Sequence, residues 1–212
     1  MKDIVISFEK YTKNIKGTTI LDNINLQLEK GNIYGFIGRN GSGKSMLFKA
    51  LCGLIKASEG KVKVNGKEIG KEVDFPENIG ILIEHPGFLE HLSGFDNLRY
   101  LAEIQNKIDE KDIINALDLV ELDYKDKKSV KKYSLGMKQR LGIAQAIMED
   151  PEIIVLDEPM NGLDKDGVKK IRELILELKN KNKTIILASH NSEDIQLLCD
   201  KVYEIDKGQI QN

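Results

Sequence analysis

A glycine-rich run that ends in Lys44-Ser45 carries the clearest chemical signal of this chain. It satisfies the spacing G-x-x-x-x-G-K-[ST] and lies between an apolar segment typical of a strand and a segment typical of a helix. Its glycines let successive backbone N–H groups converge on phosphate oxygens, and the helix that follows directs the positive end of its dipole to the same point. A glycine-rich turn without a ligand is the alternative, but the context favours a nucleotide site.

Two side chains of this loop have separate expected roles. Lys44 is expected to reach the β and γ phosphates, and the Ser45 hydroxyl to bind Mg²⁺, a hard cation that prefers oxygen ligands. The residues expected to contact the nucleotide are Gly38, Arg39, Asn40, Gly41, Ser42, Gly43, Lys44, Ser45 and Met46.

A pair of acidic residues follows a fully apolar run. Residues 153–156 are typical of a central parallel strand, and Asp157 and Glu158 come directly after them. Ligands of open α/β sheets bind beyond the carboxyl ends of the strands, so we expect Asp157 to hold Mg²⁺, directly or through water, and Glu158 to polarise an attacking water. Taken alone such a pair is more often a solvated turn, and the phosphate loop favours the functional interpretation.

The elements that must position these groups alternate between short Ile- and Val-rich runs and longer amphipathic stretches, which predicts parallel strands joined by crossover helices. We expect strands at residues 4–7, 24–28, 33–37, 61–64, 79–83, 153–156, 184–189 and 201–205, with a hairpin turn at Asn65-Gly66. We expect helices at residues 44–52, 95–103, 111–120, 137–149, 165–180 and 192–199, with Asp164 as the N-cap of the fifth. Residues 94–132 form a helical, charged block inserted into this α/β core.

The composition excludes several classes of protein. The 212 residues are 41% hydrophobic and 31% charged, which suits one globular domain with a sizeable core. Lys and Arg (32) nearly balance Asp and Glu (34), so the net charge of -2 gives no electrostatic case for nucleic acid. Cys52 and Cys199 lie in apolar helical patterns, which argues against disulfides or a metal cluster. No apolar run approaches the roughly 20 residues that span a bilayer, so membrane attachment is expected only through partners.

The segment 133–140, YSLGMKQR, narrows the choice among nucleotide-binding proteins. It resembles the signature of ATP-binding cassette (ABC) proteins, whose usual form is Leu-Ser-Gly-Gly-Gln: Ser134 and Gly136 match this form, and Leu135 and Met137 depart from it. Ser134 also stands where it could cap a helix that attracts a phosphate, and an ordinary capped helix is the alternative. The resemblance implies that Ser134 and Gly136 bind, across a dimer, the ATP held by the phosphate loop of a second copy.

Two further segments resemble the family. Residues 161–164, NGLD, are similar to its D-loop, which contacts the opposite subunit, and Asp164 is implied to lie at the nucleotide there. His190 follows the apolar run 184–189 and matches the switch histidine, which is expected to reach the γ-phosphate and to orient Glu158. A lone histidine at a strand end is usually structural, so this role depends on its position in the family pattern.

Two positions depart from that pattern or match it weakly. The family usually has a glutamine after the run 79–83, where this chain has Glu84. The resemblance implies that Glu84 lies near Mg²⁺ and the catalytic water. A carboxylate is a stronger Mg²⁺ ligand than an amide, but it adds negative charge near ATP. A solvent-facing loop residue is the alternative. An aromatic ring that stacks on adenine is implied before the second strand, and Tyr11 is the nearest candidate, although it could equally be a surface tyrosine.

The resemblance covers essentially the whole chain and implies an α/β fold: a P-loop NTPase (RecA-like) parallel-sheet core with an N-terminal antiparallel β subdomain and an inserted helical subdomain. We expect a single nucleotide-binding domain over residues 1–212, with the core at 1–84 and 141–212 and the helical subdomain at 85–140.

The implied function is that of an ATPase with ATP and Mg²⁺ as cofactors. Water attacks the γ-phosphate in line, Glu158 orients the water, Lys44 and Mg²⁺ neutralise charge, and His190 and Glu84 complete the catalytic set. The implied partners are a second copy of the chain and transmembrane permease subunits at the cytoplasmic face of the cell membrane, with no nucleic acid. The signature variant and Glu84, which resemble forms found in exporters of lantibiotics, favour export of a peptide antibiotic or drug. An importer ATPase and a non-transport assembly or sensing module are the alternatives.

Overall fold

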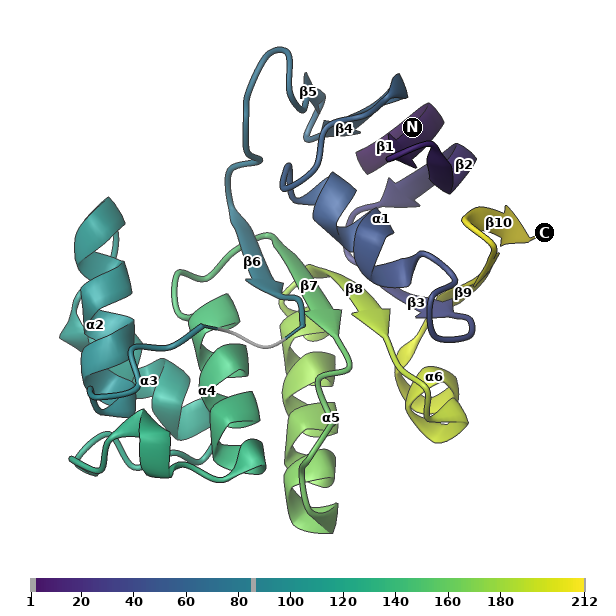
Figure 1. The fold of residues 1–212 in the computed structure, drawn as a ribbon. Helices are drawn as coiled ribbons and strands as arrows, with labels where there is room; N and C mark the ends of the chain where they lie inside the picture. The colour runs from purple at the N-terminus through teal and green to yellow at the C-terminus, as the bar shows by residue number, and fades with distance from the viewer. Residues whose placement is uncertain (1–2, 85–86, 212) are drawn as a thin grey trace.

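The computed structural model describes residues 3–84 and 87–211, which form two sheets and six α-helices in this described part (Figure 1). The larger sheet has the strand order β10-β9-β3-β8-β7-β6. Five of its strands run parallel: β3 (Ile33–Ile37), β6 (Ile79–Leu82), β7 (Ile153–Asp157), β8 (Thr184–Ala188) and β9 (Lys201–Asp206). The last strand, β10 (Gln209–Gln211), pairs antiparallel with β9. Every residue of β7 and β8 is buried, as expected for central strands covered on both faces.

The smaller sheet is antiparallel and has the order β2-β1-β4-β5. Its strands are β1 (Ile4–Ile15), β2 (Thr18–Glu29), β4 (Glu59–Val64) and β5 (Lys67–Glu68). Asn65 and Gly66 join β4 to β5 with φ values of 48° and 80°, which confirms the predicted hairpin turn because both central residues of a type I′ turn need positive φ. Helix α1 (Lys44–Leu51) packs in the core between the two sheets, where Phe48 meets Phe36 of β3 edge to face at 5.6 Å.

Three helices form a block at one end of the parallel sheet (Figure 1). They are α2 (Gly94–Gln105), α3 (Glu110–Leu119) and α4 (Leu135–Ile147), and a short 3-10 helix, η1 (Val130–Lys132), precedes α4. Helix α4 contacts α3 on one side and β6 and β7 on the other. The expected boundary at residues 140 and 141 therefore falls inside a continuous helix, and the start of the helical block at residues 85 and 86 lies outside the described residues.

The contact between α4 and β6 is unusually close. A Cβ atom added to Gly80 of β6 would lie 1.7 Å from the carbonyl oxygen of Ala146, near the end of α4. Only a residue without a side chain fits at this point, because the neighbouring atom belongs to the backbone and cannot rotate away.

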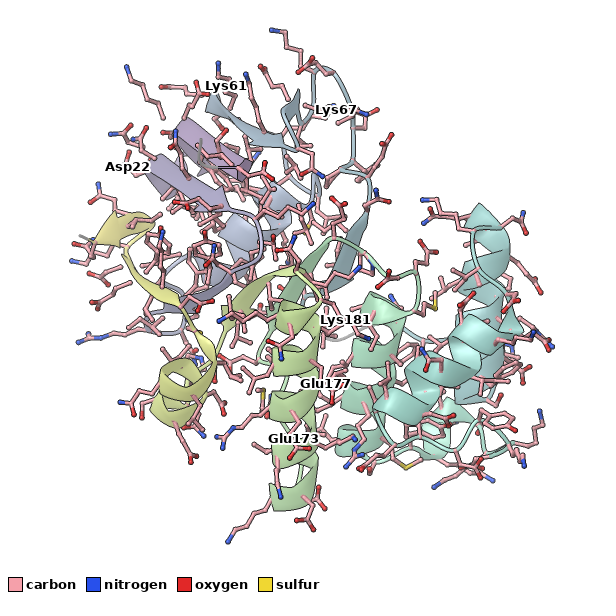
Figure 2. All side chains as sticks on the ribbon, turned by 180° about the vertical axis from the view of Figure 1, so that it is seen from behind. Asp22, Lys61, Lys67, Glu173, Glu177 and Lys181 are labelled. Atoms are coloured by element: carbon pink, nitrogen blue, oxygen red, sulfur yellow. The ribbon has the colours of Figure 1, made fainter. Side chains whose placement is uncertain are left out.

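Helix α5 (Lys165–Asn180) covers the parallel sheet, and α6 (Ser192–Leu198) packs beside it. The inner face of α5 is buried through Ile171, Leu174, Ile175 and Leu178, which repeat at helical spacing. Glu173 and Glu177, together with the C-cap Lys181, are exposed on the outer side (Figure 2). Asp164 is the N-cap of α5, as predicted, and its carboxylate accepts a hydrogen bond from Gly167 N at 3.0 Å.

The predicted strands and helices are all present, and the predicted α/β class with an antiparallel N-terminal sheet and inserted helices is confirmed. The hairpin strands β1 and β2 are longer than predicted, and β5, β10 and η1 were not predicted. Cys52 and Cys199 are free thiols. In the part of the chain that the structure describes, none of the helices is both long and apolar enough to cross a bilayer.

Candidate active site

The glycine-rich loop connects β3 to α1 at the carboxyl edge of the parallel sheet. Gly38 has a φ of 151°, and a Cβ atom there would lie 2.2 Å from the carbonyl oxygen of Ile205, so the loop can enter this position only with glycine. The Lys44 side chain is 7% exposed and its Nζ donates to the carbonyl oxygens of Gly38 at 2.6 Å and Arg39 at 3.3 Å. The ammonium group is therefore held inside the curve of the loop.

The first turn of α1 meets the end of β7. The Ser45 hydroxyl donates to Asp157 Oδ2 at 2.6 Å, and Asp157 is buried at the last position of its strand. A hydroxyl and a carboxylate oxygen thus lie together beside the phosphate loop, as the two separate sequence signals predicted.

These two groups fit Mg²⁺. The ion accepts one or two protein oxygens and takes its remaining ligands from phosphate and water, and its charge would neutralise phosphate oxygens. No cluster of three or more His, Cys, Asp or Glu side chains suited to a metal occurs among residues 3–84 and 87–211, so a site built from protein ligands alone is not present in that part. The Ser42 hydroxyl is buried and has no hydrogen-bond partner among the described residues, which fits a phosphate oxygen as its partner.

Glu158 is held by contacts from two other elements, β8 and α4, and from the loop that follows β8. Its φ of 52° turns the chain sharply after β7, and its backbone N–H donates to Ala188 of β8 at 3.0 Å. Gln139 of α4 donates to the Glu158 carbonyl oxygen at 2.9 Å. The backbone N–H of His190 donates to Glu158 Oε2 at 3.2 Å, and His190 Nε2 lies 3.3 Å from Oε1. The predicted pair of Glu158 and His190 is therefore in contact.

Burial raises the pKa of Glu158 above its ordinary value. The hydrogen bond from the His190 backbone and the charges of His190 and Lys44 oppose this shift, and the charge of Asp157 adds to it. A carboxylate with a raised pKa is a stronger base than a solvated one, which suits a group that polarises water.

All these groups face one cavity of about 450 Å³. The predicted residues that line it are Asn40, Gly41, Ser42, Gly43, Lys44, Ser45, Met46, Glu84, Asp157, Glu158 and His190. Four residues that the sequence did not single out as site residues also line it: Ile15, Ile20, Gln139 and Asn161. The predicted residues Tyr11, Ser134, Gly136 and Asp164 are absent from the lining, and Gly38 and Arg39 reach the site through Lys44.

Tyr11 is a correction. The ring is fully buried between β1 and its neighbours, packs edge to face on Phe8 at 5.4 Å, and its hydroxyl donates to the Ile55 carbonyl oxygen at 3.3 Å. Burial raises its pKa to about 12. Neither face of the ring is open to an adenine. Two apolar residues of the N-terminal sheet, Ile15 and Ile20, line the nucleotide cavity instead.

Glu84 lines the cavity and is separated from the end of β6 by one residue, Ile83. Its φ is 57°, its side chain is exposed, and Oε1 accepts from Lys49 Nζ of α1 at 2.6 Å. The glutamate is thus close to the last turn of α1 and is paired with a cation, which offsets part of the negative charge that it brings to the site.

The segment that resembles the signature begins α4, and its first residues, Ser134 to Gly136, do not line this cavity, whereas Gln139 one turn later does. Ser134 is the N-cap and accepts from Met137 N at 3.2 Å, as predicted. A Cβ atom on Gly136 would lie 2.8 Å from the carbonyl oxygen of Gly162, so this segment packs directly against residues 161–164. Ser134 and Leu135 are exposed.

Comparison with known proteins supports one family. The family model described as "ABC transporter" matches residues 21–161. The "Uncharacterized ABC transporter ATP-binding protein YybJ" of Bacillus subtilis (strain 168) is 44% identical over 200 residues, 94% of this chain and 92% of that protein. The "Bacitracin transport ATP-binding protein BcrA" of Enterococcus faecalis is 38% identical, over 98% of this chain and 68% of that protein.

Two more matches extend the comparison. The "Lantibiotic transport ATP-binding protein SrtF" of Streptococcus pyogenes is 37% identical, over 97% of this chain and 89% of that protein. A solved structure described as "Dimeric structure of a post-hydrolysis state of the ATP-binding cassette MJ0796 bound to ADP and Pi" has a TM-score of 0.88 at 22% identity, over 98% of this chain and 97% of that one. This last likeness bears on the fold.

Proposed function

Because the chain belongs to the ABC transporter family and is one of its ATPases, we propose that it powers a separate transmembrane permease from the cytoplasmic face of the cell membrane. One observation carries this proposal: four different elements and loops bring their polar side chains to a single cavity. These side chains are Lys44, Ser45, Asp157, Glu158 and His190. Phosphoryl transfer to water needs a phosphate cradle, a cation site and a group that orients water, and all three lie within this cavity.

The proposed reaction is in-line attack of water on the γ-phosphate of ATP. Lys44 and the N–H groups at the start of α1 stabilise the charge on the phosphate oxygens, and Ser45 and Asp157 hold Mg²⁺. Glu158 accepts a hydrogen bond from the water and orients it, and His190, 3.3 Å from Glu158, faces the same cavity.

We propose that the working unit is a dimer of two copies. The helix start at Ser134 and Gly136 carries a free dipole end but lies outside its own chain's cavity, so a second copy is needed to bring it to a phosphate. The solved cassette with the same fold is described as dimeric, which supports this arrangement.

A second cavity, of about 470 Å³, supports a docking site for the permease. It lies between β6, the end of α2 and the end of α4, and its lining combines exposed apolar side chains, Phe75 and Ile104, with polar and charged ones such as Glu77 and Lys107. Phe75 is 61% exposed and Ile104 is 69% exposed, an unusual loss of apolar burial unless another chain covers them. Glu84 lies two residues beyond the end of β6, so the strand that borders this groove leads to a residue that lines the nucleotide cavity.

For the transported molecule, we propose a peptide antibiotic that is exported. The relatives named for bacitracin and lantibiotic transport match nearly the whole chain, which supports this class of substrate. Expression of the chain together with a candidate transmembrane permease from the same genome, in a strain sensitive to bacitracin and nisin, tests this proposal. Protection that is lost with Lys44→Ala supports it, and uptake of a nutrient without protection contradicts it.

Glu158→Gln tests the catalytic role. ATP turnover is expected to fall about 100-fold or more, because an amide cannot act as the base. Glu173→Gln, on the exposed side of α5, is the matched control and should keep wild-type turnover. On a sizing column, Glu158→Gln should accumulate as a dimer that requires ATP. Equal turnover in both variants removes Glu158 from its proposed role, and a persistent monomer with bound ATP counts against the dimer.

A further inference from the structure

The structure contains a buried carboxylate outside the nucleotide cavity. Three residues with charged side chains are buried in the described part of the chain: Lys44, Asp157 and Asp194. The first two line the nucleotide cavity, whereas Asp194, at 0% exposure, lies in the first turn of α6. Burying a carboxylate costs several kcal/mol unless its oxygens are fully paired, so the partners of Asp194 show what the position requires.

Both oxygens of Asp194 are paired. Arg172 of α5 donates from Nε at 2.8 Å and from Nη2 at 2.6 Å to Oδ1. The hydroxyl of Ser189 donates to Oδ2 at 2.9 Å, and it is buried like its partner. The carboxylate therefore joins α5 to the residue that directly precedes His190.

Ser189 in turn shapes the backbone around His190. Its hydroxyl oxygen accepts from the backbone N–H of Asn191 at 3.1 Å, so this hydrogen bond spans His190, from the residue before it to the residue after it. Between these two residues, the backbone N–H of His190 donates a hydrogen bond to Glu158 Oε2 at 3.2 Å. The chain of contacts runs without a gap from Arg172 to Glu158.

We propose that Arg172, Asp194 and Ser189 form a positioning network that fixes residues 189–191 and so holds His190 against Glu158. None of the three residues lines the nucleotide cavity, whereas His190 does, so the network acts through His190. Because α5 begins directly after residues 161–164, the network also links that segment, which packs against Gly136, to the histidine. This inference rests on the proposed function, since its effect appears as ATP turnover.

Ser189→Ala removes the link to the loop and leaves the ion pair between Arg172 and Asp194 in place. We expect the kcat for ATP to fall about 10- to 100-fold, the range for losing one hydrogen bond to a charged group, with KM changed less than about twofold. Ser189→Thr keeps the hydroxyl and should restore kcat. The matched control is Lys179→Gln, which breaks the ion pair of Lys179 with Asp200 at the other end of α5 and should leave kcat unchanged.

A double variant separates positioning from a general effect on folding. In the His190→Ala background, Ser189→Ala should cause a much smaller loss of kcat than in the wild-type chain, because the imidazole that the network positions is gone and only the backbone contact to Glu158 remains. The chain has three histidines, so ¹⁵N-histidine spectra give a second readout: the ring signals of His190 should shift and broaden in Ser189→Ala and not in Lys179→Gln.

Wild-type kcat in Ser189→Ala, or an equal loss with and without His190, overturns the network while leaving the proposed function intact. Absence of ATP turnover in the wild-type chain overturns the proposed function, and the ¹⁵N-histidine readout then still decides whether Ser189 holds His190.

Discussion

The contact between Gly136 and Gly162 gives a prediction in which two effects oppose each other. Gly136 lies in the first turn of α4, and alanine there is favoured by helix propensity by about 1 kcal/mol. The added Cβ, however, would lie 2.8 Å from the carbonyl oxygen of Gly162. That atom belongs to the backbone, so segment 161–164 must move by several tenths of an ångström, and overpacking of this kind costs about 1 to 3 kcal/mol.

The net effect of Gly136→Ala on stability is therefore a loss of about 0 to 2 kcal/mol in the free energy of unfolding. The effect on activity is expected to be larger. Segment 161–164 leads to the cap of α5 and includes Asn161 in the cavity lining, and misplacement of a site by about 1 Å can cost about 100-fold in rate. We expect turnover to fall at least about tenfold, while ATP binding to the phosphate loop is retained.

Urea unfolding followed by circular dichroism measures the first quantity, and ATP turnover at saturating ATP measures the second. Gly87→Ala is the control, because a Cβ atom there meets nothing within 4 Å, and it should match the wild type in both assays. A Gly136→Ala variant that gains about 1 kcal/mol in stability and keeps wild-type turnover would refute the close contact and the reasoning built on it.

Three further predictions concern the core and the site. Tyr11→Ala should lower the free energy of unfolding in urea titrations by about 3 to 5 kcal/mol, because it removes a buried ring. The ATP affinity of the folded fraction should be unchanged, and a loss of affinity for adenine nucleotides but not for guanine nucleotides would show that the ring stacks on the base. Since the pKa of Glu158 is raised and its ionised form is the base, kcat should fall as pH decreases through that pKa, whereas Glu158→Gln should show no such limb in its pH–rate profile. Ser45→Ala should raise the Mg²⁺ concentration for half-maximal turnover about tenfold or more and leave ATP binding in EDTA unchanged, and identical Mg²⁺ titrations would remove Ser45 from the cation site.

The sequence was most informative where one residue type is needed for a local reason. Gly38 and Lys44 could be assigned from spacing because the loop between β3 and α1 is a local structure. The apolar run of β7 predicts a central strand. Because ligands of parallel sheets bind beyond the carboxyl ends of the strands, the acidic residues at the end of this run are predicted to lie at the site. Asp164 and Ser134 could be identified as caps from their own short segments.

The sequence failed where the outcome depends on a partner far along the chain. Tyr11 looked like a candidate for stacking because it precedes the second strand, yet its burial is decided by Phe8 and by Ile55, which follows α1. The polar hairpin β1–β2 was predicted too short, because its ladder of hydrogen bonds does not need apolar alternation and is interrupted by register shifts.

Gln139 was missed for a related reason. It lies in the quoted signature segment, but only the packing of α4 against the end of β7 brings its amide to the Glu158 carbonyl oxygen. Its position in a helix face with mostly apolar neighbours was the available signal, since a buried glutamine needs a partner.

The close approach of Gly80 to Ala146 also suggests how movement could be amplified within the molecule. The contact lies near the end of a 13-residue helix, so it can act as a fulcrum. From Ala146 back to Ser134 the helix extends about 18 Å, and a tilt of about 10° at the fulcrum displaces the far end by about 3 Å. Any rotation of α4 about this contact would therefore displace Ser134 further than it displaces the residues that pack against β6.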